Sequence, residues 1–404
     1  MGTTRNVSLA AREYIFTDLD YMKEVCYVNE TRTSTEILHE SYGKRLVALI
    51  IAIIGFIGNT TIAILFWKKS GRVNFHLLVM MLSIYDNLAI LMNLSLFIIP
   101  NLIKSEANVQ EIIQTENDFI PFTFPVLEFA LTSSIYFTVA ITVERYLIVC
   151  HPFYAISRRW PIKTYMFSIS LFCLVYNIPR SLELKTLECQ NGKIDTSSLC
   201  ANDPQSWKSF FINHSHNCSF TQNMLVFTDV GCSSWYFYVY HIGLESIFEF
   251  IIPFSLLVIM NGLIIKNILS KIQLQNPITK WRNKRSIANQ KTSNNKSFPR
   301  TDSVTRMNKE DMKRAITSVI IVAIFIVCYS IIWVSRVYQL LNESNTNICM
   351  LKRSLIYGYI FTTINSSIKC YAYFFMHYNP IKYLKSLYAR KKSISDAKTI
   401  STAG

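Results

Sequence analysis

The stretch SSIYFTVAITVERYLIVCHPF, residues 133–153, decides the fold of this chain. An apolar helical run leads into Glu144-Arg145-Tyr146, continues through a second apolar patch and stops at His151-Pro152, where the proline ends the helix. An Arg at the centre of a membrane helix costs ~3 kcal/mol, and less near the interface. The charged pair is therefore either an interfacial Arg that reaches water beside a Glu, or part of a functional site. Residues elsewhere in the chain favour the functional site.

Composition places the chain among membrane proteins. Half of its 404 residues are hydrophobic, and only 17% are charged. Seven apolar spans can be counted, each near the ~20 residues that a helix needs to cross a bilayer. They are residues 44–67, 75–100, 119–150, 164–184, 236–269, 313–341 and 354–377. The predicted fold class is an all-α integral membrane protein, a bundle of seven transmembrane helices.

The basic charge of the chain is collected in particular segments. The net charge is +15, and residues 266–314 alone hold 13 Lys and Arg against 3 Asp and Glu. A nucleic-acid-binding protein is the alternative explanation. The basic segments alternate with neutral or acidic ones as the spans intervene, however, which is the positive-inside pattern of a membrane protein. We therefore expect a multi-pass plasma-membrane protein in contact with lipid, with an extracellular N-terminus, a cytoplasmic C-terminus and no nucleic-acid partner.

These assignments divide the chain into three parts. Residues 1–43 form an extracellular N-terminal segment without the apolar stretch of a cleavable signal peptide. Residues 44–377 form the transmembrane domain, with a long extracellular loop at 185–235 and a basic cytoplasmic loop at 270–312. Residues 378–404 form a cytoplasmic tail that opens with a short amphipathic eighth helix, whose apolar face suits the membrane interface.

The extracellular parts carry modification sites. Acceptor tripeptides for glycosylation occur at Asn6, Asn29, Asn213 and Asn217. Six cysteines fall outside the membrane, an even number in an oxidising compartment, and are disulfide candidates: Cys26, Cys189, Cys200, Cys218, Cys232 and Cys349. Six cysteines allow about 15 pairings, and the choice among them stays open.

Polar residues inside the spans predict a buried polar network. Its expected members are Asn59, Asp86, Ser134, Asn365 and Lys369. Such groups can hold helices together, at about 0.6 kcal/mol each, or form an ion or water site. Asp86 and Lys369 are both ionisable at mid-membrane depth, so adhesion between helices explains neither easily.

Taken in order, these motifs resemble the rhodopsin-like (class A) family of G protein-coupled receptors. The resemblance rests on Gly58-Asn59, Leu82-Ser83-x-x-Asp86, Glu144-Arg145-Tyr146 and Pro253, and it covers the whole seven-span region. Within the family, the chain is most similar to invertebrate FMRFamide-type neuropeptide receptors. The segments that carry this similarity are TVERYLIVCHPF, YNIPR at the end of span 4, and IIPF followed by MNG in span 5.

The resemblance implies roles for several residues. Arg145, with Glu144 and Tyr146, holds the resting state and then meets a heterotrimeric G protein, and Asp311 stands where the family has its acidic lock partner. Arrestin and a receptor kinase are implied at the C-terminal tail. The family keeps an Asn at the position of Lys369, near a sodium ion held by the Asp. We predict that Lys369 pairs with Asp86 here, which makes a bound sodium ion redundant.

The chain also departs from the family pattern. Span 6 reads Cys328-Tyr329-Ser330-Ile331 where the family has Cys-Trp-x-Pro, and we expect Phe325 and Tyr329 to share the work of the missing Trp. Span 7 keeps only Tyr373 of the Asn-Pro-x-x-Tyr motif. The family's third-helix Cys falls at Ile120, so the usual disulfide to the long loop is not expected. A divergent receptor fits these losses, and a signalling-dead relative fits them less well.

The ligand site is expected in the outer half of the bundle. Its candidates are Glu128, Glu245, Glu249, Trp333 and Arg336. Carboxylates at this depth are costly unless a cation meets them, and a peptide ending in Arg-Phe-amide would supply a guanidinium for the acids and a ring for Trp333. In the alternative, Glu245 and Glu249 face water or pair with nearby basic residues.

The sequence is compatible with three functions. The first is a peptide-gated receptor that activates a G protein. The second is a small-molecule or odorant receptor, although the Asp that an amine receptor needs in the outer half of span 3 is missing. The third is an ion or solute transporter, against which the order of receptor motifs argues. An enzyme is disfavoured because no nucleophile–base set or metal-ligand spacing occurs, and neither cofactor nor metal is expected.

Overall fold

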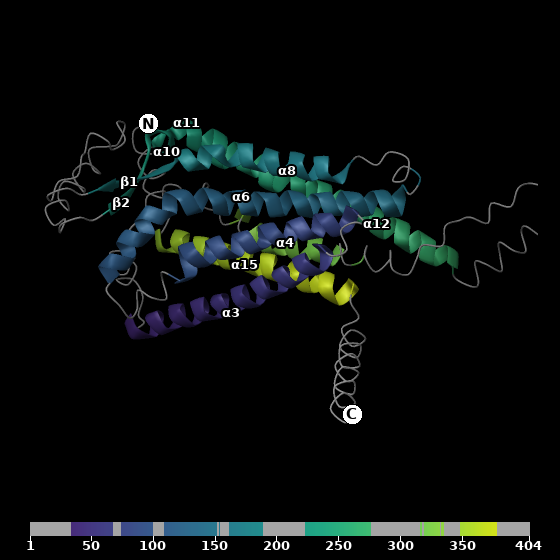
Figure 1. The fold of residues 1–404 in the computed structure, drawn as a ribbon, viewed down its shortest axis with the longest axis horizontal. Coiled ribbons are helices and arrows are strands. Elements are labelled where there is room, and N and C mark those ends of the chain that lie inside the picture. The colour runs from purple at the N-terminus through teal and green to yellow at the C-terminus, as the bar shows by residue number, and fades with distance from the viewer. Residues whose placement is uncertain are drawn as a thin grey trace, which may run out of the picture.

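A computed structural model describes residues 34–67, 74–99, 109–151, 153, 161–188, 223–275, 316, 319–331, 333–334 and 348–377. These residues form a bundle of long helices that run side by side, with one small β-hairpin at one end (Figure 1). We call this end of the bundle the hairpin end and the opposite end the Arg145 end.

The first four spans are helical over most of their length. Their elements are α3 (Ser34–Trp67), α4 (Asn74–Asn93) with the π-helical turn η1 (Leu94–Ile98), α6 (Val109–Cys150) and α8 (Ile162–Asn177) with the 3₁₀ turn η2 (Ile178–Leu182). The end of α6 at Cys150 confirms the stop predicted at His151-Pro152. Span 4 was predicted to continue to residue 184, but its α-helix ends at Asn177, two residues before Pro179. Pro179 has no N–H to donate to the Val175 carbonyl four residues back, and Ile178 instead bonds that carbonyl, so the α-helix gives way to the 3₁₀ turn.

The remaining elements complete the bundle. The hairpin strands are β1 (Leu184–Glu188) and β2 (Asn223–Phe227). Span 5 begins with the short helices α10 (Asp229–Cys232) and α11 (Ser234–Tyr236), continues as two π-helices, η4 (Phe237–Leu244) and η5 (Ser246–Ile251), and ends as α12 (Ile252–Gln275). The described core of span 6 is the helix Val319–Ile331, and span 7 is α15 (Ile348–His377).

Helices begin earlier than the apolar runs that predicted them. The helix of span 1 starts at Ser34, where the sequence predicted residue 44, and that of span 3 starts at Val109, where it predicted residue 119. Hydrophobicity marks only the length that lies in lipid, whereas backbone hydrogen bonds continue into polar sequence. Among the described residues, four helices are long and apolar enough to cross a membrane: Arg45–Trp67, Phe75–Leu96, Asp118–Cys150 and Tyr238–Ser270.

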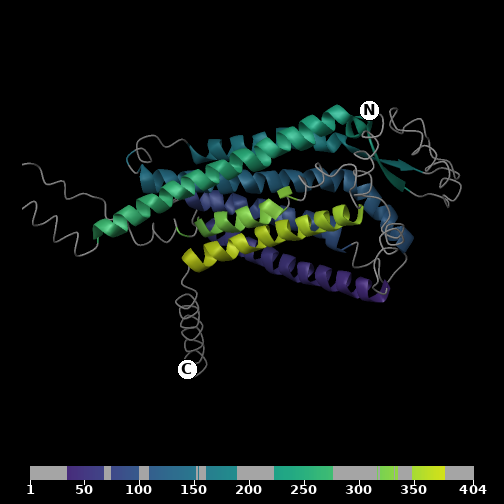
Figure 2. The same ribbon diagram turned by 180° about the vertical axis from the view of Figure 1, so that it is seen from behind.

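The helix α6 lies at the centre of the bundle. It contacts α4, α8 and α12, and its membrane-length part is the most buried of the four candidate spans. In Figures 1 and 2 it runs between α8 on one side and α4 on the other. The outer helix α3 instead exposes apolar side chains such as Ile53, Ile57 and Ile64, which suit contact with lipid.

The hairpin packs directly onto α6. Its strands are antiparallel, with Leu184 opposite Phe227 and Glu188 opposite Asn223. A two-stranded hairpin is marginal alone, and this one gains contacts from α6 and a hydrogen bond from the Thr228 N–H to the Glu183 carbonyl, at 2.9 Å. The long loop predicted at 185–235 therefore contains regular structure next to the bundle.

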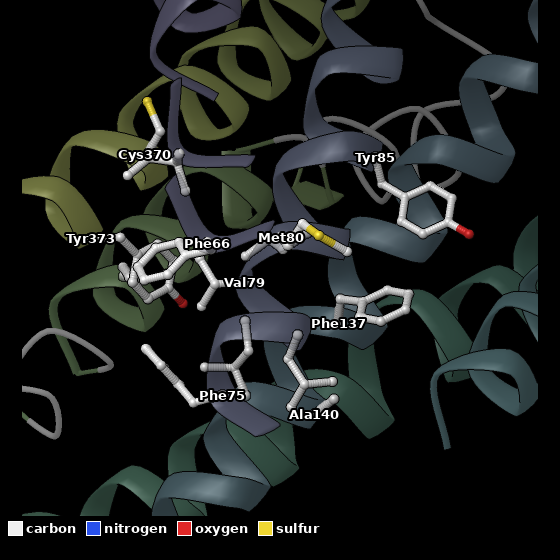
Figure 3. Close-up of a cluster of buried hydrophobic side chains, with 14 residues drawn as sticks. Phe66, Phe75, Val79, Met80, Tyr85, Phe137, Ala140, Cys370 and Tyr373 are labelled. Carbon is white, nitrogen blue, oxygen red and sulfur yellow. The ribbon is translucent and has the colours of Figure 1, made fainter. Parts of the chain in front are cut away.

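A cluster of buried apolar side chains joins five spans near the Arg145 end, with Ile321 as its member from span 6. Figure 3 shows the cluster, in which rings and aliphatic chains from α3, α4, α6 and α15 meet. Its labelled members are Phe66, Phe75, Val79, Met80, Tyr85, Phe137, Ala140, Cys370 and Tyr373. This core holds the first, second, third, sixth and seventh spans in a fixed relation.

Two glycines allow α3 to approach α15 closely. A Cβ atom at Gly55 would lie 2.8 Å from the Ser367 Cα, and one at Gly58 would lie 2.5 Å from the Cys370 Sγ. Both distances are too short for carbon contacts, so neither position accepts a side chain without moving the helices apart.

We predict that Gly55→Ala lowers the thermal unfolding midpoint of the detergent-purified protein, because overpacking of this kind costs ~1–3 kcal/mol. Gly262→Ala is the matched control, since a Cβ at that helical position meets no atom within 4 Å. Alanine favours a helix over glycine, so the control should be neutral or slightly stabilising. Equal midpoints for the two variants would contradict the close approach.

Candidate functional site

A cluster of paired charges lies at the hairpin end. The 3₁₀ turn η2 carries Arg180, which is only 4% exposed and forms an ion pair with Glu245 of span 5. Its guanidinium also lies 3.7 Å from Glu183, the residue that joins η2 to β1. Arg180 therefore ties the end of span 4 to span 5 and to the base of the hairpin.

His241 completes this cluster by bridging the two carboxylates. Its Nε2 atom lies 3.1 Å from Glu183 Oε1, and its Nδ1 atom lies 2.9 Å from Glu245 Oε1. A carboxylate accepts hydrogen bonds, so both ring nitrogens must donate, and only the doubly protonated imidazolium can do this. The cluster then holds two positive and two negative groups, as buried charges require.

Aromatic side chains enclose the cluster. The Tyr236 hydroxyl donates a hydrogen bond of 2.6 Å to Glu183. The Arg180 guanidinium lies 5.6 Å from the ring centroids of both Phe124 and Tyr240, within reach of a cation–π interaction. This enclosure keeps water away and strengthens the ion pairs.

Two further carboxylates lie near this cluster. Glu128 is 4% exposed, and its charge acts on Arg180, yet its carboxylate makes no hydrogen bond or ion pair with the residues that the structure describes. Thr132, one turn along α6, places its hydroxyl 2.8 Å from the Glu128 carbonyl and 3.2 Å from Glu249 Oε1. Glu249 of span 5 therefore reaches the turn of α6 that follows Glu128.

Four carboxylates lie at the hairpin end. Within the described residues, Glu183 and Glu245 belong to the paired cluster with Arg180 and His241. Glu128, which is buried, and Glu249, which accepts a hydrogen bond from Thr132, lie outside that cluster. We call these two residues the acidic subsite.

The five predicted ligand-site residues do not all lie at one site in the structure. Glu245 is paired with Arg180, which agrees with the alternative that it meets a nearby basic residue. Trp333 stacks on Phe250 of η5, with centroids 4.5 Å apart, beside the turn that carries Glu249. Arg336 lies outside the described residues. The sequence did not identify Arg180, Glu183 and His241, although YNIPR and the four-residue spacing from His241 to Glu245 were visible signals.

A second polar site lies in the middle of the bundle. Lys369 Nζ lies 2.8 Å from Asp86 Oδ1 and 2.6 Å from Ser134 Oγ. The Ser134 hydroxyl donates to Asp86 at 2.7 Å, which closes a triangle of three buried side chains. The ion pair predicted between Lys369 and Asp86 is present. Asn59, also in the predicted network, donates to the Ser366 carbonyl at 3.0 Å, and Asn365 is buried.

We predict that Asp86→Asn impairs folding more than Asp86→Asn combined with Lys369→Asn. The single change leaves a buried ammonium without its carboxylate, at a cost of ~3–5 kcal/mol, whereas the double change removes both charges. Surface expression and the thermal midpoint measure the effect, with Ser134→Ala as the control that keeps both charges. A double variant worse than the single one would contradict the ion pair as the reason.

A third set of predicted residues lies at the Arg145 end. Arg145 is 1% exposed, and its guanidinium lies 3.5 Å from the Phe75 ring centroid. The Tyr373 ring of span 7 contacts the Phe75 ring edge to face, with the two centroids 5.9 Å apart. Span 7 therefore contacts the same ring as Arg145.

The other residues expected to act in activation are partly described. Phe325 and Tyr329 of span 6 pack together with tilted rings, whose centroids lie 4.5 Å apart, in an apolar cluster with Ile135 and Val139 of α6. The Tyr146 hydroxyl lies 3.0 Å from His151 Nε2, and Glu144 precedes Arg145 on the same helix. Asp311 is outside the described residues, so the lock between Asp311 and Arg145 stays a prediction.

Comparison with known proteins identifies the family. The family model described as the seven-transmembrane receptor of the rhodopsin family matches residues 58–381. The chain belongs to this family. It is therefore a receptor and a multi-pass plasma-membrane protein, and the family implies a seven-helix bundle, so the predicted resemblance and fold class are confirmed.

Two curated relatives are FMRFamide receptors. The chain is 29% identical to the FMRFamide receptor of Drosophila melanogaster over 182 residues, which are 44% of this chain and 33% of the relative. It is 26% identical to an FMRFamide peptide receptor of Caenorhabditis elegans over 224 residues, 54% of this chain and 44% of the relative. The match thus spans less than half the length of either relative.

Several predicted sites lie outside what the structure describes. These are the glycosylation sites Asn6, Asn29, Asn213 and Asn217, the side chains of the six outer cysteines, and the amphipathic eighth helix after residue 377. In the described part of the chain, no group of three or more His, Cys, Asp or Glu side chains is arranged to hold a metal ion.

Proposed function

We propose that this chain binds an extracellular peptide with a basic side chain, of the FMRFamide type, and activates a heterotrimeric G protein. The observation that carries the proposal is the buried carboxylate of Glu128 in the acidic subsite, one turn from the Thr132 that binds Glu249 of span 5. Glu128 is buried there without a hydrogen-bonded partner among the described residues. A guanidinium offers a forked donor that suits two carboxylates on facing helices. The relatives named FMRFamide receptors support the same ligand class.

The orientation of the bundle agrees with this proposal. The basic segment 276–315 follows α12 at the Arg145 end, and basic segments stay on the cytoplasmic side. The hairpin end then faces outward, where a peptide can reach the acidic subsite. Arg145 faces the cytoplasm, where a G protein binds.

Binding and signalling are joined by helices that carry both sites. A ligand shifts a two-state bundle only if it binds one state better than the other. A basic group between Glu128 and Glu249 would hold spans 3 and 5 together. Span 3 continues as one helix from Glu128 to Arg145, so a movement at one end is transmitted to the other.

The test of the ligand class removes a charge from the receptor in one comparison and from the peptide in the other. We expect Glu128→Gln or Glu249→Gln to weaken a peptide ending in Arg-Phe-amide by ~1.5–3 kcal/mol, the range for hydrogen bonds to charged groups. The same variants should leave the citrulline analogue, which is neutral and of the same shape, nearly unaffected. Peptide-dependent G protein activation in cells provides the measurement.

Glu245→Gln is the matched control for this test. Glu245 is already paired with Arg180 and His241, so its loss should reduce surface expression and affect both peptides alike. Equal losses for both peptides in all three variants would remove the acidic subsite as the reason for a basic ligand. A response to small amines but to no peptide would favour the small-molecule receptor instead.

The cytoplasmic side has its own test. We expect Asp311→Ala to raise basal signalling, because the acid then no longer holds Arg145 at rest. Arg145→Ala should abolish coupling while peptide binding persists. The neighbouring Glu310→Ala is the control and should leave basal signalling low. Unchanged basal activity of Asp311→Ala at equal surface expression would contradict the lock.

A further inference from the structure

The guanidinium of Arg145 rests on an aromatic ring at the start of α4. Arg145 and Phe75 are each only 1% exposed, and the guanidinium carbon lies 3.5 Å from the centroid of the Phe75 ring. A cation is attracted to the face of an aromatic ring when it lies within about 6 Å of the centroid, and the attraction grows when water is excluded. The geometry is therefore that of a buried cation–π pair between spans 3 and 2.

The place of Phe75 in its helix makes this ring face important. The helix α4 begins at Asn74, so Arg145 lies beside the N-terminal turn of that helix. The N-terminus of a helix carries a partial positive charge, which disfavours a neighbouring cation. A desolvated cation–π contact is roughly twice as strong as this repulsion, or more. The ring face therefore offsets the repulsion and lets a guanidinium stay buried here, whereas an aliphatic side chain would offer no such compensation.

Neighbouring rings hold the Phe75 ring in place. Tyr373 of α15 packs edge to face with it at 5.9 Å, and His76 does so at 6.1 Å. His76 in turn stacks on Phe66 of α3, with centroids 4.9 Å apart. Figure 3 shows Phe66, Phe75 and Tyr373 in this one cluster. The ring that faces Arg145 therefore cannot turn away without disturbing its contacts with spans 1 and 7.

The central ion pair joins the two helices that supply these rings. Lys369 precedes Tyr373 by four residues on α15, so the two side chains lie on one face of that helix. Asp86 follows Phe75 on α4. The contact between Lys369 and Asp86 thus fixes spans 2 and 7 against each other and keeps Phe75 and Tyr373 together.

We propose that Phe75 is a positioning residue that keeps Arg145 buried in the resting receptor through the face of its ring. Arg145 has to leave this ring before it can contact a partner in the cytoplasm, so the strength of the contact sets the level of basal signalling. The signalling part rests on the proposed function, whereas the contact itself does not depend on it. The contact is distinct from the lock predicted between Arg145 and Asp311, which would act by pairing of opposite charges.

The first experiment weakens the ring face while nearly preserving the size of the ring. Phenylalanines that carry one, two or three fluorine atoms replace Phe75. Each fluorine withdraws electron density from the ring face and so weakens its attraction for a cation. We expect basal G protein activation to rise with each fluorine, up to roughly 5- to 30-fold when the whole contact is lost. The measurement is signalling without peptide, at equal surface expression.

Phe137 is the matched control for this series. Its ring is buried in the same cluster and stacks on the neutral ring of Tyr85 at 5.3 Å. The same fluorinated residues at position 137 should leave basal signalling unchanged. A flat series at Phe75, or equal rises at both positions, in a receptor that a peptide still activates would overturn the proposal.

The second experiment measures the contact without ligand or G protein. Thermal unfolding midpoints of the detergent-purified receptor are compared in a double-mutant cycle of Phe75→Leu and Arg145→Leu. Phe75→Leu should lower the midpoint by roughly 2–3 °C more in the native receptor than in the Arg145→Leu background. The control cycle of Phe137→Leu with Arg145→Leu should show additive changes.

The two experiments separate the contact from the signalling. Additive midpoints for Phe75→Leu and Arg145→Leu would overturn the cation–π pair. If these midpoints are coupled but no peptide activates a G protein, the proposed function fails together with the signalling part, and the contact between Phe75 and Arg145 stands.

Discussion

The Lys369–Asp86 ion pair is the interaction on which the rest of the bundle depends. A charge within a bilayer must be met inside the protein, because lipid offers it neither hydration nor hydrogen bonds. The pair joins span 7 to span 2, and Ser134 adds span 3 to it. Its closed triangle brings together the same three spans that form most of the apolar cluster near the Arg145 end. The centre of the bundle is thus a charged contact that joins spans 2, 3 and 7.

Helix α6 contributes residues to three sites along its length. Glu128 belongs to the acidic subsite, Ser134 to the central triangle, and Arg145 to the contact with Phe75 at the Arg145 end. These residues lie on one continuous helix whose described contacts include α4, α8 and α12. A rigid element shared by separate sites is the physical basis for coupling between them. The structure therefore gives the receptor a single axis along which a change at the hairpin end can reach the Arg145 end.

The sequence predicted the parts of this protein that its apolar pattern exposes. The membrane spans follow from hydrophobicity, and the pairing of Lys369 with Asp86 follows from the cost of isolated charges in lipid. The Arg180 cluster was not predicted, because Arg180 and Glu183 stand at the end of a span, where charges are ordinarily solvated and call for no partner. The hairpin was hidden in a long polar loop. The π-helices of span 5 were hidden as well, because an apolar run has the same composition whichever register its backbone adopts.

The two charged sites within the bundle differ in one respect that bears on their use. The central site supplies its own counter-ion, since its carboxylate and its ammonium belong to the same chain and are both fully buried. The hairpin-end site pairs Glu245 with Arg180, and it also holds the buried carboxylate of Glu128, which makes no hydrogen bond with the described residues. Such a buried carboxylate raises the free energy of the empty receptor, and a cation that enters removes this cost in addition to forming its own hydrogen bonds. A closed site suits a structural role, and an open one suits recognition, so the division of charge along the bundle separates the part that must not change from the part that waits for a ligand.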